Sequence, residues 1–343
     1  MVGPLVDRSD RADNFAGSGG VCLLQRRRKE FSATYLQALL QSPSTLEQLA
    51  SMMVGSTFKR ANVEQIRSLK VAMPPPPEQK AIAEQIDCID DLISTTHALI
   101  LKKRGVKQAA MQELLTGKRR LPGFEGEWAQ VSLGSVAAMN SGGTPPTGRD
   151  DFYGGGIPWV SISDMTTSGR FISETERTLS DLGLANCAAK RFPAGTILYA
   201  MYASLGECSI AACEVTTSQA ILGIRPSPSL ASDYLYYYLC SIHDMVKQMG
   251  QQGTQSNLNK KIVQGFTLKL PKKSEQLAIA RVLCEIDQEL DAVKSMAKKI
   301  RNMKTGMMQN LLSGKIRLSK KLHDPASEAL ITADTFRSRE VRK

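Results

Sequence analysis

Few residues of this 343-residue chain have the types and spacing that catalysis needs. The segment from Glu176 to Asp181 brings carboxylates close together, but no lysine or histidine accompanies them, so it fits a loop or helix cap better than acid–base catalysis. The stretches "LLTGKR" and "LLSGKI" lack the first glycine of a nucleotide-binding P-loop and the Ser/Thr after its lysine. The proline cluster Pro74 to Pro77 is followed by "EQK", not by the aromatic residue of a DNA adenine methyltransferase motif. We therefore expect no intrinsic catalysis.

The seven cysteines do not form a metal or disulfide pattern. They are scattered without a CxxC pair, and the chain has only three histidines. A zinc site or disulfide framework is therefore not expected, and neither is a cofactor. We expect reduced, mostly buried thiols. The cysteines are Cys22, Cys88, Cys187, Cys208, Cys213, Cys240 and Cys284.

Basic residues exceed acidic ones, which favours a polyanionic partner. The net charge is +11 and the pI is about 9.3. A solvated surface also explains each basic run taken alone, but together the runs make nucleic acid the leading partner class. The runs are Arg26 to Lys29, Lys102 to Arg104, Lys118 to Arg120, Lys260-Lys261 and Lys320-Lys321.

Two turn-rich segments carry small polar and basic side chains suited to nucleic acid. "SGGTPPTGRDD", from Ser141, offers backbone N–H groups for phosphate, and "GTQSNLNKK", from Gly253, adds two lysines. The phosphate candidates are Thr144, Lys260 and Lys261. The base-edge candidates are Arg170, Tyr202, Ser204, Gln219 and Gln255. For each candidate, an ordinary turn or strand role is the alternative. An architectural role suits Gly142, Gly143, Pro145, Pro158 and Trp159 better.

These candidates lie within a duplicated sequence. Every residue from Glu78 to Leu121 aligns without a gap with the residue 197 positions later, and 18 of the 44 pairs are identical. A repeat this long indicates two large modules, each a domain followed by a helix, and not a solenoid.

Each copy carries the signals of one long helix. "MPPPPEQKAIAEQI" and "LPKKSEQLAIARVL" place prolines and an acidic residue at a helix start, with Ser274 as a candidate N-cap. Gly117 and Gly314 suit the left-handed residue that closes a helix. Nearly forty residues make a helix on the order of 55 Å long.

Apolar residues recur every three or four positions along both helices, as in a coiled-coil seam. The second helix has Ile279, Leu283, Ile286, Leu290, Val293, Ala297, Ile300, Met307 and Leu311, with Lys304 the only charged residue in the register. The first has Ile82, Ile86, Ile89, Ile93, Ile100, Ala110 and Leu114, with Thr96, Lys103 and Lys107 as weaker steps. We expect the helices to pair antiparallel and hold the preceding domains at opposite ends. The alternative is two independent helices, each folded onto its own domain.

The sequence between the helices, residues 126–271, predicts a mixed α/β domain. Strand candidates bounded by turn residues are Gly195 to Tyr202, Cys208 to Ala212, Gln219 to Arg225 and Phe266 to Pro271. Ser232 to Met249 predicts a helix capped by Ser232 or Asp233, with one apolar face. That face consists of Leu235, Leu239, Ile242 and Val246.

The first copy of this domain is incomplete. "SGGVCLLQR" (Ser18 to Arg26) echoes Thr217 to Arg225, and "YLQALLQS" (Tyr35 to Ser42) echoes Tyr234 to Ser241, but counterparts of about 126–212 are missing. Truncation, fusion or a misread gene start would explain this. We expect an unmatched, disordered segment 1–13, an incomplete first domain 14–75, a helix 76–117, an intact second domain 118–272, a helix 273–314 and a polar tail 315–343.

The ordered series of motifs resembles the specificity subunit of type I restriction-modification systems. It runs from "MNSGGTPPTGRDDFYGGGIPWVSISDM" through "TTSQAILGIRP", "GTQSNLNKKIVQGFTLKLP" and "EQLAIARVLCEID" to "NLLSGKIRL". The resemblance implies an α+β fold of duplicated target-recognition domains and paired long helices. It implies a non-catalytic subunit that reads a split sequence in double-stranded DNA. The helices would dock methyltransferase subunits and, through them, restriction and translocase subunits.

One question of function stays open at the level of sequence. With one intact domain, the chain could read a half-site, associate with a second copy, or be a truncated or silent cassette that acts only as a protein scaffold.

No apolar run is long enough to span a membrane and "MVGPLVDRSDRAD" has no signal-peptide pattern, so we expect a cytoplasmic protein without a membrane partner.

Overall fold

The computed structural model describes residues 32–53, 61–252 and 258–318. The chain forms two compact units. The first unit joins residues up to Ile100 with those from Ala292 onward, and the second runs from Leu101 to Asp291. Two long helices, α4 (Pro76–Leu114) and α11 (Lys273–Leu311), each contribute one part to either unit.

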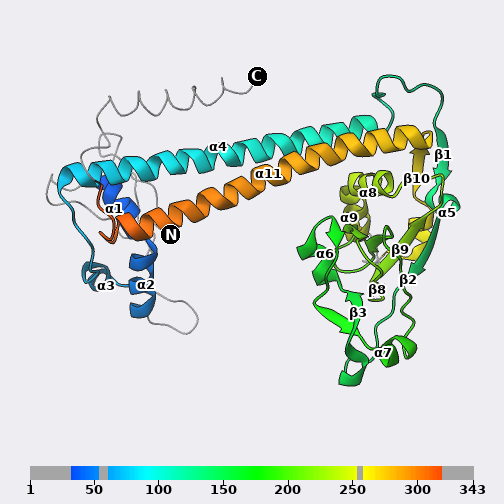
Figure 1. Cartoon of the computed structure of the whole chain (residues 1–343), viewed down its shortest axis with the longest axis horizontal. Coiled ribbons are helices and arrows are strands. Elements are labelled where there is room, and N and C mark those ends of the chain that lie inside the picture. The colour runs from blue at the N-terminus through cyan, green and yellow to red at the C-terminus, as the bar shows by residue number, and fades with distance from the viewer. Residues whose placement is uncertain (1–31, 54–60, 253–257, 319–343) are drawn as a thin grey trace, which may run out of the picture. The chain divides into compact units, whose positions relative to one another are not determined.

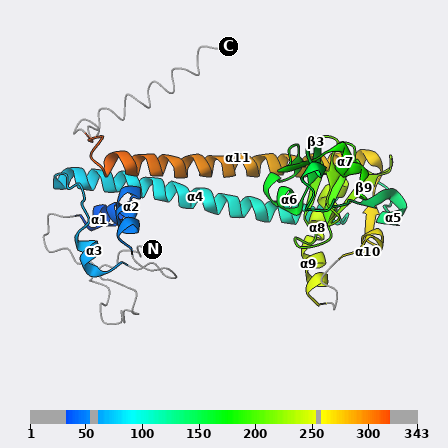
Figure 2. The same ribbon diagram turned by 90° about the horizontal axis from the view of Figure 1, so that it is seen from below.

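The two long helices pair antiparallel within each unit (Figure 1 and Figure 2). In the second unit Lys103 binds Glu289 and Lys107 binds Asp287, both with an N–O distance of 2.6 Å. In the first unit Lys304 binds Asp90 at 2.5 Å. The predicted apolar seam is confirmed, because most of its residues are buried. They include Ile82, Ile86, Ile89, Ile100, Leu114, Ile279, Leu283, Leu290, Ala297, Ile300 and Leu311.

Both helices end in the same way. The regular helix stops at Leu114 or Leu311, and the glycine three residues later is left-handed, with φ of +73° at Gly117 and +75° at Gly314. The backbone then turns back, because the N–H of Arg119 donates to the carbonyl of Glu113 and that of Ile316 to the carbonyl of Asn310. The predicted glycine closure is confirmed. Ser274 lies inside α11, which begins at Lys273, so its prediction as the N-cap is wrong.

Three short helices precede α4 in the first unit. They are α1 (Ala33–Leu40), α2 (Pro43–Met52) and α3 (Val63–Arg67). Ser32, Ser42 and Asn62 cap them by accepting a backbone N–H in the first turn. Tyr35 and Leu39 of α1 join Ile82 and Ile86 of α4 and Met308 of α11 in one core.

The second unit contains three sheets. The largest has the order β2-β9-β6-β7-β4, in which only β4 and β7 are parallel neighbours. Its strands are β2 (Ala137–Ser141), β4 (Phe171–Ile172), β6 (Ile197–Ala200), β7 (Cys208–Ala211) and β9 (Ile221–Pro226). A second sheet contains β5 (Arg177–Leu179), β3 (Tyr153–Val160) and β8 (Thr216–Thr217), and β1 (Ala129–Ser132) pairs with β10 (Thr267–Leu270).

Short helices surround these sheets. They are α5 (Leu133–Val136), the 3-10 turn η2 (Asp150–Phe152), α6 (Ile162–Ser168), α7 (Asp181–Ala185), α8 (Ser232–Ser241), α9 (His243–Gln252) and α10 (Lys260–Gln264). The central strands β6 and β7 are buried along their whole length, which their nearly unbroken apolar sequences allow. Tyr234 and Tyr237 of α8 are fully buried in the same core as Ile279 and Leu283 of α11, so this helix attaches the sheet to the long helices.

The four predicted strands are confirmed as β6, β7, β9 and β10, each shorter than predicted, although β9 ends one residue later, at Pro226. The predicted helix Ser232 to Met249 is two helices, α8 and α9, interrupted at Ile242. Neither Ser232 nor Asp233 caps α8, because Ala231 occupies the cap position without a side-chain bond, and that prediction is wrong. The predicted apolar residues Leu235, Leu239 and Val246 are buried.

The duplication is visible in matching hydrogen bonds. The Tyr35 hydroxyl donates to the carbonyl of Ala72 at 2.9 Å, and the Tyr234 hydroxyl to that of Lys269 at 2.8 Å. The carboxamide oxygen of Gln79 accepts the N–H of Ser32, and that of Gln276 accepts the N–H of Ala231. The described part of the first unit therefore packs its helices as the second unit does.

Candidate nucleic-acid interface

Four loops of the second unit are joined by backbone hydrogen bonds, and they carry most of the predicted contact residues. The N–H of Gly143 donates to the carbonyl of Thr217, and the N–H of Gln219 to the Thr144 hydroxyl at 3.4 Å. The N–H of Met201 donates to the carbonyl of Ala220, and the N–H of Leu258 to that of Met201. We call these the reading loops: residues 142–146, 201–207, 217–220 and 258–261. Thr144, Tyr202, Ser204, Gln219, Lys260 and Lys261 all lie in them.

In the loop between β6 and β7, Tyr202 is exposed to solvent. The Tyr202 side chain is 37% exposed, although β6 before it is buried. The next residue, Ala203, has a φ of +59°, which costs an ordinary residue roughly 1 kcal/mol or more. Gly206 packs against α9, where an added Cβ would lie 3.1 Å from the His243 ring. The backbone conformation of Ala203 and the packing of Gly206 against α9 therefore both restrict the conformation of this loop.

The two predicted lysines stand at the start of α10. Asn259 caps this helix by accepting the N–H of Ile262, so that the helix begins at Lys260. Lys260 and Lys261 are exposed, and neither enters an ion pair with another described residue. Their positive charges are therefore available to an anionic partner.

Two base-edge candidates differ from the rest. Gln255 lies outside the described residues. Arg170, 15% exposed, points into the protein, where its guanidinium binds Asp233 at 2.5 Å and the Tyr237 hydroxyl at 3.1 Å. The structure thus places Arg170 apart from the reading loops.

The glycine loop does not offer its first N–H groups to phosphate, contrary to the sequence analysis. The N–H of Gly142 donates to the carbonyl of Ile221, and that of Gly143 to the carbonyl of Thr217. A Cβ on Gly142 would lie 2.1 Å from the Thr217 hydroxyl oxygen, so glycine is needed for close packing. The architectural role is confirmed for Trp159, which is buried and donates to the carbonyl of Gly143 at 3.0 Å.

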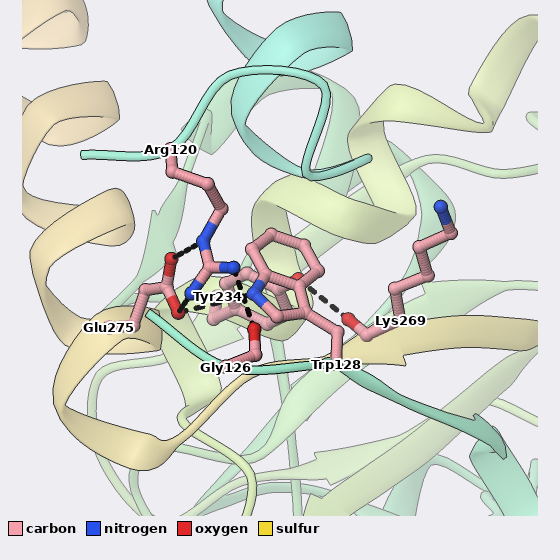
Figure 3. A network of polar contacts seen from close by, with 6 residues as sticks. All are labelled: Arg120, Gly126, Trp128, Tyr234, Lys269 and Glu275. Carbon is pink, nitrogen blue, oxygen red and sulfur yellow. Dashed lines mark hydrogen bonds and ion pairs between the residues drawn. The ribbon is translucent and has the colours of Figure 1, made fainter. Parts of the chain in front are cut away.

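Two arginines that follow the ends of the long helices have acidic partners. Arg120 binds both carboxylate oxygens of Glu275 through its Nε and one Nη, at 2.5 and 2.8 Å, and Glu275 also accepts the indole N–H of Trp128 (Figure 3). Arg317 binds Glu78 at 2.7 and 2.6 Å in the first unit. We call these two ion pairs the clasps, because each joins the start of one long helix to the segment after the other.

The clasps and the ion pairs Lys107–Asp287 and Lys304–Asp90 were not predicted from the sequence, although the repeat contains the same charged residues at both copies of each pair. Glu78 and Glu275 are 197 positions apart, and so are Arg120 and Arg317. The same offset relates the pair Lys107–Asp287 to the pair Lys304–Asp90. Identical charged residues in both copies marked every one of these contacts.

The long helices also expose apolar residues away from their seam. Leu92, Leu99 and Val106 follow one another at seven-residue intervals on α4, which keeps them on one helix face. Met296 and Met303 on α11 are the counterparts of Leu99 and Val106 at the offset of 197. We call these five residues the outer stripe.

The cysteines are less buried than expected. Of the six that the structure describes, all are free thiols, but only Cys208 is buried and Cys88 is exposed. Burial raises the pKa of the Cys208 thiol well above its ordinary value. Cys22 lies outside the described residues. Among the described helices, none is long and apolar enough to cross a membrane.

The described part of the chain is an α+β fold with two long paired helices whose sequences repeat at an offset of 197 residues, and the comparisons identify its family. The family model for the type I restriction modification DNA specificity domain matches residues 10–102 and 125–301. The chain belongs to this family.

Curated relatives in the family are specificity subunits of type I restriction enzymes. The MjaVIII subunit of Methanocaldococcus jannaschii is 24% identical over 339 residues, covering 92% of this chain and 78% of its own length. The MjaIX subunit of the same organism is 26% identical over 187 residues, covering 54% of this chain. The match spans 43% of the length of the MjaIX subunit.

Solved structures share the fold. The crystal structure of a type I restriction-modification S subunit from M. genitalium superposes with a TM-score of 0.55 and 15% identity, covering 82% of this chain and 73% of that one. A chain from a study of complex assembly and conformational transition in a type I system gives a TM-score of 0.57 with 20% identity, covering 82% and 71%.

Proposed function

We propose that this chain is a non-catalytic, cytoplasmic specificity subunit that reads half of a bipartite DNA target with the reading loops of its second unit. The observation that carries the proposal is the junction of four loops that place Thr144, Tyr202, Ser204 and Gln219 together, beside two lysines without described partners. Family membership supports the same function.

The chemistry of the reading loops suits duplex DNA. Exposed lysine ammonium groups bind phosphates and position a protein on the duplex. The carboxamide of Gln219 and the hydroxyls of Ser204 and Tyr202 can both donate and accept, as recognition of base edges requires. We therefore assign Lys260, Lys261 and Thr144 to the phosphates, and Gln219, Tyr202 and Ser204 to the bases.

We assign only half of a bipartite target to this chain because its two modules are unequal. Ahead of α4, the described residues form the helices α1 to α3 and no strand, whereas the second unit has ten strands. The first unit thus retains the contacts to the long helices without a described counterpart of the reading loops. Association with a second copy would supply another reading head.

The outer stripe is our candidate surface for methyltransferase subunits, which would connect the chain to restriction and translocase subunits. Leu99 and Met296 are equivalent, as are Val106 and Met303, so the stripe presents similar apolar residues on both helices. An exposed apolar row on a long helix is typical of an interaction surface. Two related faces would suit two copies of one partner.

The first experiment measures binding of the full chain to a duplex over a range of salt concentrations. Replacing Lys260 and Lys261 by alanine should weaken binding and reduce the salt slope by about 0.9 for each phosphate that the variant no longer neutralises. Lys298→Ala, an exposed lysine on α11, is the matched control and should leave the slope unchanged. Equal slopes for all variants would contradict the assignment of the reading loops.

A second assay tests the outer stripe. Leu99→Glu combined with Met296→Glu should abolish co-purification with the cognate methyltransferase subunit, whereas Leu46→Glu, equally exposed on α2, should not. Methylation-site sequencing of DNA from cells that express the chain then distinguishes an active specificity subunit from a cassette that acts only as a scaffold. Co-purification without sequence-specific methylation would support the alternative, a truncated or silent cassette that acts only as a scaffold.

A further inference from the structure

Arg170 is the centre of a polar and aromatic cluster between the recognition domain and the long helices. Its guanidinium binds Asp233 at 2.5 Å and donates to the Tyr237 hydroxyl at 3.1 Å and to the Cys284 sulfur at 3.2 Å. The rings of Phe171, Tyr236 and Tyr237 lie within about 5 Å of it. A guanidinium is suited to such a site because its planar face stacks on rings while its edges donate hydrogen bonds.

The cluster continues into both long helices. The Tyr237 hydroxyl donates to one carboxylate oxygen of Asp287 on α11 at 2.9 Å. The other oxygen of Asp287 binds Lys107 on α4 at 2.6 Å, and Lys107 also lies over the Tyr237 ring. One connected series thus runs from Asp233 through Arg170, Tyr237 and Asp287 to Lys107. Because each side chain fixes its neighbour, the series restrains the domain against both helices.

Among the residues of the first unit that the structure describes, only the helical part of this series is present. Its pair Lys304–Asp90 corresponds to Lys107–Asp287. In α1, however, Ala38 stands where α8 has Tyr237, and Thr34 stands where it has Asp233. Within the described residues, this side-chain link from helix pair to domain is therefore found in the unit that carries the reading loops and not in the other.

We propose that Arg170 is a positioning residue that sets the orientation of the second recognition domain on the helix pair. The reading loops move with the sheet, since β4 begins at the residue after Arg170 and pairs with β7. Loss of the guanidinium would leave the loops intact but let the domain rotate on the helices. Its effect on DNA reading rests on the function proposed above, whereas the orientation itself does not.

The test measures orientation directly in the full chain. Spin labels on noncanonical residues at Leu182 of α7 and Val106 of α4, both about half exposed, report a distance from domain to helix by electron–electron resonance. Arg170→Gln should broaden or shift the distance distribution. Arg149→Gln is the matched control, because Arg149 also pairs with an aspartate and stacks on a ring, but on the domain surface. The control should give the wild-type distribution.

Tyr237→Phe keeps the test decisive if Arg170→Gln fails to fold. It removes only the hydroxyl that links Arg170 to Asp287, and it should broaden the distribution to a smaller degree. A wild-type distribution in folded Arg170→Gln, or in Tyr237→Phe where the first variant does not fold, would overturn the proposal. Because no DNA is present, failure of the function proposed above would not affect this result.

Discussion

The carboxylate of Glu275 is 2% exposed and is held by an arginine from the segment that follows the opposite helix. Removing one partner of a buried ion pair leaves the other charge without compensation. We expect Arg120→Ala to lower the free energy of unfolding by about 3 kcal/mol, measured by urea denaturation. Arg119→Ala is the matched control, because its pair with Glu113 is long, at 3.5 Å, and exposed. Similar losses in the two variants would show that the buried clasp contributes little.

The second clasp predicts a dependence of stability on pH. The hydrogen bonds from Arg317 hold the pKa of Glu78 below its ordinary value. A folded-state pKa below the unfolded value of about 4.3 adds stability above that pH, and the gain is lost as the pH falls through the folded value. Denaturation of wild type and Arg317→Ala between pH 6 and pH 3 should therefore give curves that converge on acidification. Parallel curves would contradict the prediction.

At the scale of single residues, composition and spacing selected six polar or basic residues that the fold gathers in the reading loops, and also Arg170, which pairs inside the protein instead. Thr144, Tyr202, Ser204 and Gln219 lie in turns that follow or precede short strands. They were selected by residue type as candidates for DNA contact, and the fold brings their turns together. Arg170 could not be placed in this way. Its partners Asp233 and Cys284 are 63 and 114 positions away, and no local pattern reports such separations.

At the scale of elements, the glycines after β2 allow a test of packing. A Cβ on Gly143 would lie 2.3 Å from the backbone nitrogen of Ala189, whereas nothing lies within 4 Å of one on Gly148. Gly143→Ala should destabilise the second unit by about 1–3 kcal/mol, as overpacking does. Gly148→Ala should be close to neutral. Thermal unfolding of both variants measures the difference, and equal melting temperatures would show that the loop adapts.

The elements that could be predicted from the sequence were those with a strong apolar periodicity or with clear turn or capping residues at their ends. The long helices carried both, and the buried strands β6, β7 and β9 are apolar runs bounded by turns. The interruption between α8 and α9 was missed because Ile242 continues the apolar spacing, while the backbone there leaves the helical conformation. β1 was missed as well, since its residues are mostly exposed and it depends on pairing with the distant β10.

At the scale of the whole molecule, the ion pair of Lys304 explains why this one charged residue occupies a position in the apolar register of α11. It reaches Asp90 on the facing helix, as Lys107 reaches Asp287. Lys304→Glu or Asp90→Lys should each cost about 1 kcal/mol, and the double variant should recover at least half of the sum. Urea denaturation of the four proteins completes the cycle. Additive losses would mean that this pair does not help to fix the helix register.

The antiparallel helix pair also governs the order in which the chain can fold during synthesis. α4 ends at Leu114 and α11 begins at Lys273, so 158 residues lie between the partners. At about 5–20 residues per second, a ribosome needs on the order of 10–30 s to make them. Throughout that interval the apolar seam of α4 lacks its partner, and the domain that follows lacks the α11 residues Ile279 and Leu283 that complete its core. The nascent chain thus exposes the apolar seam of α4 before its completion, and it is at this stage, more than in the finished protein, that a chaperone or a partner subunit has most to bind.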